Sequence, residues 1–334
     1  MFKNVMVYRI GAGWSMSLAQ LEAALQAAVF VECGLTQERA VGWVPPRGDA
    51  AGPLAESIDG QWLLKLMTET KVVPGSVIAR KTKERAAQIE AATGRKPGKK
   101  ETRELKDEAR LTLLPMAFTK QASITVWVDA EARLLMVDAA SQGKADEVLT
   151  QLAKAMEGLA AVPIQTAVSP VSAMSDWLLT QEPPAGFSID RECELKASDD
   201  SKAVVRYARH ALDIDEVQQH ISHGKLPTRL AMTWEGRVSF MLTETLQIKK
   251  IAFVDGVFDD GSVTSKDDRF DADAAIATGE IRQLIPALVT ALGGEVTIGQ
   301  AAALSGAAAA PRSTPAVPAA SAATPGKTWD SPPF

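Results

Sequence analysis

Residues 73–118 read VPGSVIARKTKERAAQIEAATGRKPGKKETRELKDEARLTLLPMAF, and this stretch decides how the rest of the fold is interpreted. Pro74 predicts a helix start, Pro115 predicts a helix end, and the Gly/Pro-containing turn 94–100 separates two helical segments. Residues 80–110 hold eleven Lys and Arg against six Asp and Glu. Each segment has only a narrow apolar stripe, too narrow for a core helix. We therefore predict a helical hairpin that projects from the body and meets a partner with its basic face. The alternative is a solvated surface hairpin without a partner.

The composition is that of a globular protein with an adequate core. The chain has 334 residues, of which 46% are apolar and 23% are charged, so two lobes and a tail are expected. Cys33 and Cys193 lack CxxC spacing, which argues against a disulfide framework or a structural zinc site. The N-terminus becomes charged too early for a signal peptide, and no apolar run of 18 residues occurs. These features predict a reduced, cytoplasmic protein.

Strand patterns on both sides of the hairpin define two lobes. A strand hairpin followed by a helix occurs twice. Strands at 123–129 and 133–139 precede a helix at 143–159, and three strands at 229–234, 238–242 and 248–254 precede a helix at about 272–292. This order predicts an α+β fold with antiparallel sheets rather than a parallel βαβ sheet. The predicted division is 1–72 plus 119–170 for the first lobe, 73–118 for the projecting basic hairpin, 171–298 for the second lobe and 299–334 for an Ala/Pro-rich tail.

A second basic segment surrounds the run VVRYARHAL in the second lobe. Its cations are Lys202, Arg206, Arg209 and His210. In a strand, Arg206 and His210 would share one face and Arg209 would point to the other. The segment suits phosphate contact, but charges on an edge strand also prevent aggregation, and the pattern leaves both interpretations open.

Signs of catalysis and metal binding are weak. His220 and His223 lie one turn apart with no carboxylate or thiol at ligand spacing, which favours surface histidines over a zinc pair. Seven aspartates lack the order of a calcium loop and predict a solvated acidic loop: Asp255, Asp259, Asp260, Asp267, Asp268, Asp271 and Asp273. The motifs GxxxxGKS/T, GxSxG and HExxH are absent. We predict a protein that is not an enzyme and needs no cofactor. A metal-dependent hydrolase that uses the aspartates is the alternative.

Five strings in register carry a resemblance to a known family. They are FKNVMVYRI at 2–10, GWVPP at 42–46, LLPMAF at 113–118, LMVDAAS at 135–141 and RFDADAAIATGEI at 269–281. Over residues 1–296 their order and spacing closely resemble the RdgC family of recombination-associated proteins. The resemblance implies a ring-shaped homodimer with an α+β fold of its own. It further implies binding to duplex DNA with little sequence preference, association with the nucleoid, restraint of RecA-promoted strand exchange, and no catalysis or cofactor.

The resemblance also assigns roles to residues. We expect the DNA contacts at Arg95, Lys96, Lys99, Lys100, Lys202, Arg206, Arg209 and His210, and ring closure at Phe118, Arg80, Arg85 and Glu104. Phe118 could equally be a core residue of its own chain. A ring binds phosphates with its inner wall, so a net charge of −5 is compatible with DNA binding. Six acids in the hairpin favour a ring-closing arm whose charges pair across a two-fold axis.

Two features depart from the family pattern. Tyr207 and Ala208 stand where a more lysine-rich run is expected, which lowers the basic density of that segment. From residue 299 the composition predicts a disordered tail, and its end, WDSPPF, resembles the tip of bacterial single-stranded-DNA-binding protein. We expect Phe334 to contact replication or repair proteins; the alternative is an inert tail. The competing function for the whole chain is a protein-interaction module whose basic hairpin binds an acidic protein.

Overall fold

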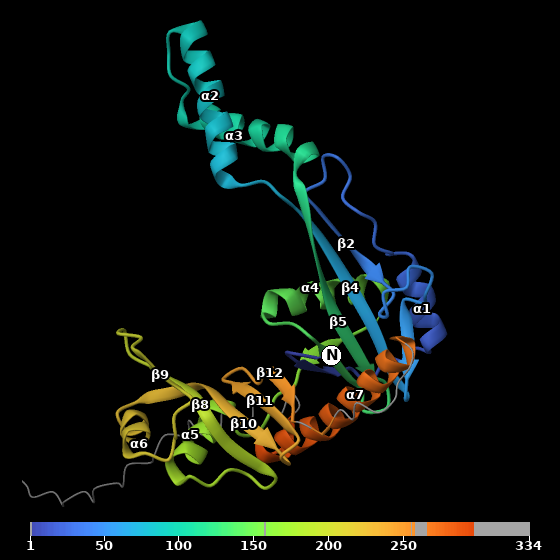
Figure 1. Ribbon diagram of the computed structural model, residues 1–334, viewed down its shortest axis with the longest axis vertical. Helices are drawn as coiled ribbons and strands as arrows, with labels where there is room; N and C mark the ends of the chain where they lie inside the picture. The colour runs from blue at the N-terminus through green and yellow to red at the C-terminus, as the bar shows by residue number, and fades with distance from the viewer. Residues whose placement is uncertain (1, 157, 255, 258–265, 297–334) are drawn as a thin grey trace, which may run out of the picture. The chain divides into compact units, whose positions relative to one another are not determined.

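The computed structural model describes residues 2–156, 158–254, 256–257 and 266–296 (Figure 1). Within these residues the chain forms seven α-helices and two antiparallel sheets, so the predicted α+β fold is confirmed. The predicted tail, with Phe334 at its end, lies outside the described residues, and so do Asp255, Asp259 and Asp260.

The first sheet has seven strands in the order β2-β4-β5-β6-β1-β7, and β3 pairs with the first residues of β4. Its strands are β1 Met6–Ile10, β2 Arg39–Val44, β3 Ala55–Ile58, β4 Gln61–Val72, β5 Phe118–Asp129, β6 Leu134–Val137 and β7 Ala161–Pro163. Helices α1 Leu18–Gln26 and α4 Gln142–Ala155 pack against one face through Leu25 and Val148.

Side chains of the first sheet point alternately into two hydrophobic clusters. On β5, Val126 and Val128 pack with α1 and α4, whereas Trp127 belongs to the cluster that contains helix α7. On β6, Leu135 and Met136 divide in the same way. Because both faces of these strands are covered, their sequences are continuous apolar runs rather than alternating ones.

The second sheet has five strands in the order β12-β11-β10-β8-β9. The strands are β8 Phe187–Ala197, β9 Val204–Ala208, β10 Lys225–Trp234, β11 Val238–Thr243 and β12 Ile248–Phe253. Helices α5 Pro170–Thr180 and α6 Asp215–Ser222 lie on one side of it (Figure 1). The opposite side of the sheet is what we call the polar face, and it carries Glu192, Glu194, Arg206, Arg229 and Lys250.

Helix α7, Lys266–Ala291, connects the two sheets. Its Ile281 packs in the cluster that both sheets share. The Nε of Arg282 donates to Oδ2 of Asp129 at 2.8 Å, at the end of β5. On the other side, Glu280 accepts hydrogen bonds from Nε and Nη2 of Arg237, which lies between β10 and β11. Residues 1–296 accordingly form one compact unit.

One sequence prediction in this part of the chain was wrong. Asp267, Asp268 and Asp271 were placed in a solvated loop, but they lie in α7. Acidic side chains in the first turn of a helix interact favourably with its dipole, so the aspartates help to start the helix.

Candidate nucleic-acid interface

The helical hairpin is inserted at the tip of the β4–β5 ladder. The two strands pair without interruption from Trp62 opposite Val128 to Val72 opposite Phe118. Helices α2 Gly75–Thr93 and α3 Lys99–Leu113 follow at that tip, and the short 3₁₀ helix η1 Leu114–Met116 leads back into β5. Figure 1 shows the hairpin at the end of these two strands.

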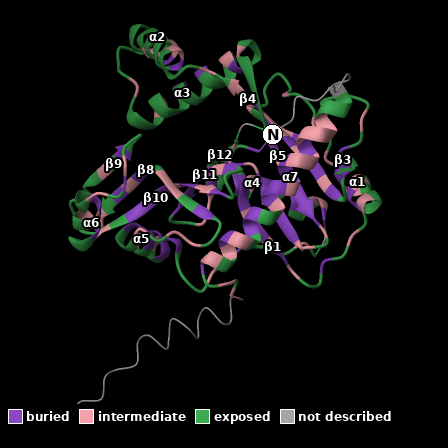
Figure 2. Ribbon diagram, turned by 60° about the horizontal axis from the view of Figure 1, so that its bottom comes forward, coloured by how far each residue is buried: buried purple, intermediate pink, exposed green. Residues whose placement is uncertain are grey.

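The hairpin has a small core of its own. Ile78 and Thr82 of α2 and Leu105 and Ala109 of α3 are buried, whereas most other side chains of the two helices are exposed (Figure 2). Gly94 ends α2 in the left-handed region with φ of 71°, a conformation that glycine adopts without a steric penalty. The basic turn 94–100 therefore sits at the far end of the arm, with its side chains in solvent.

Polar contacts brace the base of the arm. The carboxylate of Glu69, only 2% exposed, accepts the backbone N–H of Cys33 at 2.6 Å and the side-chain amide of Gln121 at 3.2 Å. These hydrogen bonds, the one from Cys33 foremost, hold the pKa of Glu69 below its ordinary value. Arg110 of α3 bonds Glu38 at 2.6 Å. The loop between α1 and β2 is thus fixed beside the strands that carry the hairpin.

The cations predicted for the turn have acidic partners inside the hairpin. Arg95 bonds Glu101 at 2.9 Å, and the Arg95 guanidinium lowers the pKa of that carboxyl. Lys96 lies 3.9 Å from Glu90, and Lys100 lies 4.0 Å from Glu104. Exposed pairs of this kind contribute about 0–1 kcal/mol, so these side chains are free to exchange a carboxylate for a phosphate. Lys99 has no ion-pair partner among the described residues.

The three charged residues predicted to close a ring also have partners within the arm. Arg80 lies 3.8 Å from Glu84, and Arg85 lies 3.9 Å from Glu108. Glu84, Glu104 and Glu108 therefore have cationic partners within their own hairpin, and they need no cation from a second copy of the chain to be paired. A role for Arg80, Arg85 and Glu104 in ring closure stays a prediction.

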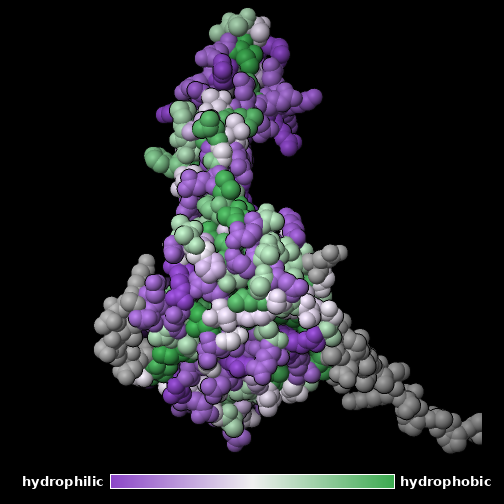
Figure 3. Space-filling view, turned by 90° about the vertical axis from the view of Figure 1, so that its right-hand side faces the viewer, coloured by the Kyte–Doolittle hydropathy of each residue, from purple (hydrophilic) through white to green (hydrophobic). Residues whose placement is uncertain are grey.

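An apolar patch lies where the arm joins the sheet. We call Val72, Val77, Leu113, Met116 and Phe118 the base patch; they line a cavity of about 260 Å³. Phe118 is 87% exposed and Met116 is 72% exposed, so Phe118 is not a core residue of its own chain. Figure 3 shows apolar surface among polar side chains at this junction.

The second basic segment lies at the edge of the second sheet, where β9 is the last strand. Arg206 extends from β9 and bonds Glu194 at 2.5 Å. We predicted that strand alternation would place His210 on the same face as Arg206. Strand β9 instead ends at Ala208, and Arg209 has a left-handed φ of 57°, so the alternation does not extend to His210. His210 contacts the carbonyl of Ala211 at 2.7 Å. Lys202 is exposed, with a left-handed φ of 47°.

Glu194 organises the cations of the polar face. Besides Arg206 it lies 4.0 Å from Arg229 and accepts the hydroxyl of Thr228 at 2.9 Å. Partial burial acts to raise the pKa of Glu194, but the hydrogen bonds from Arg206 and Thr228 outweigh it, and the pKa lies below its ordinary value. The carboxylate is therefore ionised at neutral pH and offsets one of the two guanidinium charges.

Three cations of this sheet were not among the predicted site residues, namely Arg191, Arg229 and Lys250. Arg229 alternates with buried Leu230 on β10, so strand periodicity could have placed it on the polar face. Arg191 and Lys250 follow no such rule, because the ladders beside them are irregular.

The groups predicted as alternative metal sites do not assemble. His220 lies 2.9 Å from Nζ of Lys225 and 3.8 Å from Glu216. No three His, Cys, Asp or Glu side chains are placed to hold a metal ion in the part of the chain that the structure describes. No helix there is long and apolar enough to cross a bilayer.

Comparison with known proteins identifies the family. A family model described as "Putative exonuclease, RdgC" matches residues 1–295. A recombination-associated protein RdgC of Cupriavidus pinatubonensis is 44% identical over 296 residues, and one of Dechloromonas aromatica is 42% identical over 300 residues. Another from a Janthinobacterium strain is 43% identical over 297 residues. Each alignment covers 88% of this chain and 98% of the relative, and the predicted resemblance is thereby confirmed. The chain belongs to the RdgC family.

Proposed function

We propose that this protein binds duplex DNA without sequence preference, as a ring closed by two copies of the chain, and acts in recombination by limiting RecA access to DNA. The observation that carries the proposal is the basic turn 94–100, held in solvent at the end of an arm. The relatives are named recombination-associated proteins, which supports the pathway. Restraint of RecA and association with the nucleoid rest on the family resemblance.

Charge distribution supports phosphate contact rather than base reading. The hairpin cations are long, exposed side chains on helices, and they outnumber the hairpin acids in a chain whose net charge is −5. Lys and Arg that neutralise phosphates release counterions, which gives sequence-independent affinity with a steep salt dependence. The DNA-binding roles of Arg95, Lys96, Lys99, Lys100, Lys202, Arg206, Arg209 and His210 belong to this proposal.

The base patch supports ring closure by a second copy. A two-fold contact places the same residues of both chains against each other, so an exposed Phe118 would meet its counterpart or the neighbouring Met116. Large exposed apolar side chains that line a shared hollow are typical of interface cores.

A salt titration tests the DNA proposal. We expect the double variant Lys99→Gln/Lys100→Gln to lower the slope of log K against log salt by about two and to weaken binding at least about tenfold near 0.15 M salt. Fluorescence anisotropy on two unrelated duplexes gives both quantities. Lys144→Gln/Lys154→Gln removes two exposed charges from α4 and should change neither. Wild-type protein that fails to bind random duplex at this salt would instead favour the acidic-protein partner.

The matching family model is described as a putative exonuclease, so degradation of DNA by this protein needs its own test. We predict that end-labelled linear duplex stays at full length during incubation with the protein and Mg²⁺ or Mn²⁺. Metal-dependent nucleases hold their ions with clustered carboxylates, and the described residues offer no such cluster. Shortened products that exceed those of a mock purification would show that the protein is an exonuclease.

A further inference from the structure

Two irregularities in the second sheet create a hollow on its polar side. Between β8 and β10, the pairing jumps from Cys193–Leu230 to Ile189–Met232, so residues 190–192 stand opposite Ala231 alone. Between β11 and β12, the pairing jumps from Ser239–Ala252 to Met241–Lys249. β-Bulges re-aim side chains and are over-represented beside functional sites.

The hollow has a volume of about 300 Å³. We call it the bulge pocket; Asp190, Glu192, Arg209, Ala231, Ser239 and Lys250 are among the residues that line it. Small side chains at 231 and 239 leave room at its floor. A second hollow of about 350 Å³ shares Asp190 and Arg191 with it, so residues 190–191 form the ridge between the two.

Two residues that line the bulge pocket have strained backbones. Lys250 has φ of 52° and Arg209 has φ of 57°. Residues other than glycine, asparagine and aspartate rarely adopt this left-handed backbone conformation. Such conformations persist where the surrounding structure imposes them, and they cluster at binding sites. Here both place a cationic residue at the same hollow.

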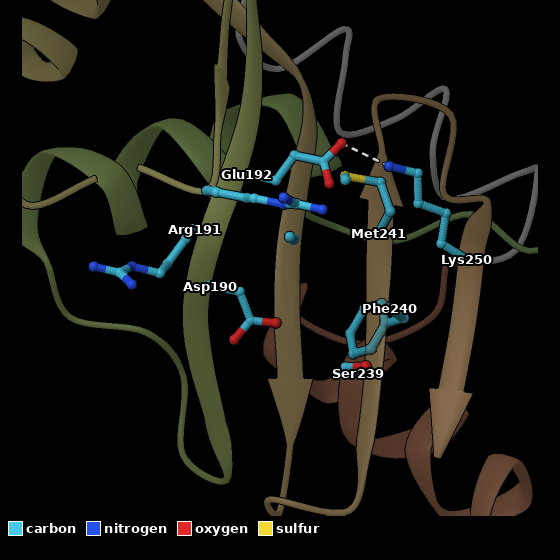
Figure 4. A pocket seen from close by; sticks show the side chains of 9 residues that line it. Asp190, Arg191, Glu192, Ser239, Phe240, Met241 and Lys250 are labelled. Carbon is cyan, nitrogen blue, oxygen red and sulfur yellow. Dashed lines mark hydrogen bonds and ion pairs between the residues drawn. The ribbon is translucent and has the colours of Figure 1, made fainter. Parts of the chain in front are cut away.

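The acids of the pocket already have partners. The carboxylate of Asp190 accepts the hydroxyl of Thr233 at 2.9 and 3.1 Å. Glu192 and Lys250 reach toward each other and bond at 2.6 Å, while Arg191, itself part of the ridge, points away from both (Figure 4). Neither Arg191 nor Arg209 has a hydrogen bond or ion pair from its guanidinium to another described residue. Arg209 therefore offers the pocket a guanidinium that bonds no other described residue, and Arg191 carries a second such guanidinium on the opposite side of the ridge.

We propose that the bulge pocket binds a phosphate ester. A guanidinium donates two parallel hydrogen bonds to phosphate oxygens, and Arg209 lines the hollow with these donors unused. Lys250 adds a second cation once a phosphate competes with Glu192, and Arg191 extends the positive surface over the ridge. The phosphate can belong to a DNA backbone, in which case the inference rests on the proposed function, or to a free nucleotide.

Paired variants of the full-length chain test the site. Arg191→Gln/Arg209→Gln should lower the salt slope of duplex binding by about one to two and weaken affinity about five- to thirtyfold near 0.15 M salt. Glu192→Gln frees Lys250 and should strengthen binding several-fold, a gain that misfolding cannot produce. Lys144→Gln/Lys154→Gln serves as the charge-matched control. Calorimetric titration with ADP, a free phosphate ester, and with pyrophosphate, which offers the phosphate oxygens without an ester, measures binding in the absence of DNA.

The outcomes separate the site from the proposed function. Wild-type protein that binds duplex, with slope and affinity unchanged in the double variant and in Glu192→Gln and with no ADP or pyrophosphate binding that the double variant loses, overturns the pocket and leaves DNA binding intact. Pyrophosphate binding that the double variant loses, without duplex binding by the wild type, supports the pocket and overturns the proposed function. Binding of neither duplex nor pyrophosphate overturns both.

Discussion

Replacing Phe118 by aspartate is expected to open the ring that we propose. Phe118 is 87% exposed and forms a cross-strand pair with Val72 at the end of the β4–β5 ladder. Burial of a phenylalanine side chain contributes about 1.5–3 kcal/mol, and a two-fold interface buries one Phe118 from each copy, so this contribution is made twice. Its loss should weaken the contact between arms by about 3–6 kcal/mol, a factor of about 10² to 10⁴. An aspartate adds repulsion between two like charges across the axis.

Residence time on circular DNA measures ring closure. A closed ring slides off the ends of a linear plasmid but stays on the same plasmid as a relaxed circle. Wild-type protein should therefore dissociate more slowly from the circle, and Phe118→Asp should dissociate from both forms at the same rate. Leu111→Asp is the control, because Leu111 is 56% exposed but does not line the base patch cavity. A difference that survives in Phe118→Asp would exclude the base patch as the closing contact.

Replacing Arg282 by methionine is expected to destabilise the whole compact unit. The Asp129 carboxylate is 1% exposed, and Arg282 Nε is its cationic partner at 2.8 Å. Removing one partner of a buried pair costs about 3–5 kcal/mol, because the remaining charge is left buried without compensation. The Arg282 side chain is 40% exposed, so solvent screens part of the effect and we expect about 3 kcal/mol.

Urea unfolding at one fixed protein concentration measures this effect. The double variant Asp129→Asn/Arg282→Met removes the buried charge together with its partner and should be more stable than Arg282→Met alone. Arg39→Met breaks the more exposed pair with Glu147 and should cost about 1 kcal/mol or less. Equal losses for Arg282→Met and Arg39→Met would show that the pair with Asp129 does not tie α7 to the first sheet.

Most features of the hairpin could be predicted from the sequence. Its two helices, the turn at Gly94 and the exposed cations follow from local rules, namely helix signals, glycine conformation and a narrow apolar stripe. The strand pairs 123–129 with 133–139 and 229–234 with 238–242 were predicted for the same reason, since their apolar patterns are local. The start of α7 was missed because Asp267 to Asp273 have no apolar periodicity before Ala274, the first buried residue of the helix.

By itself, the sequence determined the family, the α+β class and the helical arm. The family follows from matching sequence strings, and the helices and strands follow from periodic patterns among residues close together in the chain. Only the tertiary structure decided which cations are already paired with a carboxylate and which can bind a ligand. Glu194 bonds Arg206 from the adjacent strand, and Phe118 stays in solvent at the base of the arm. The guanidinium groups of Arg209 and Arg191, beside a bulge, bond no other residue that the structure describes. Ladder register, bulges and the burial of a side chain depend on residues far apart in the chain, and no local pattern encodes them.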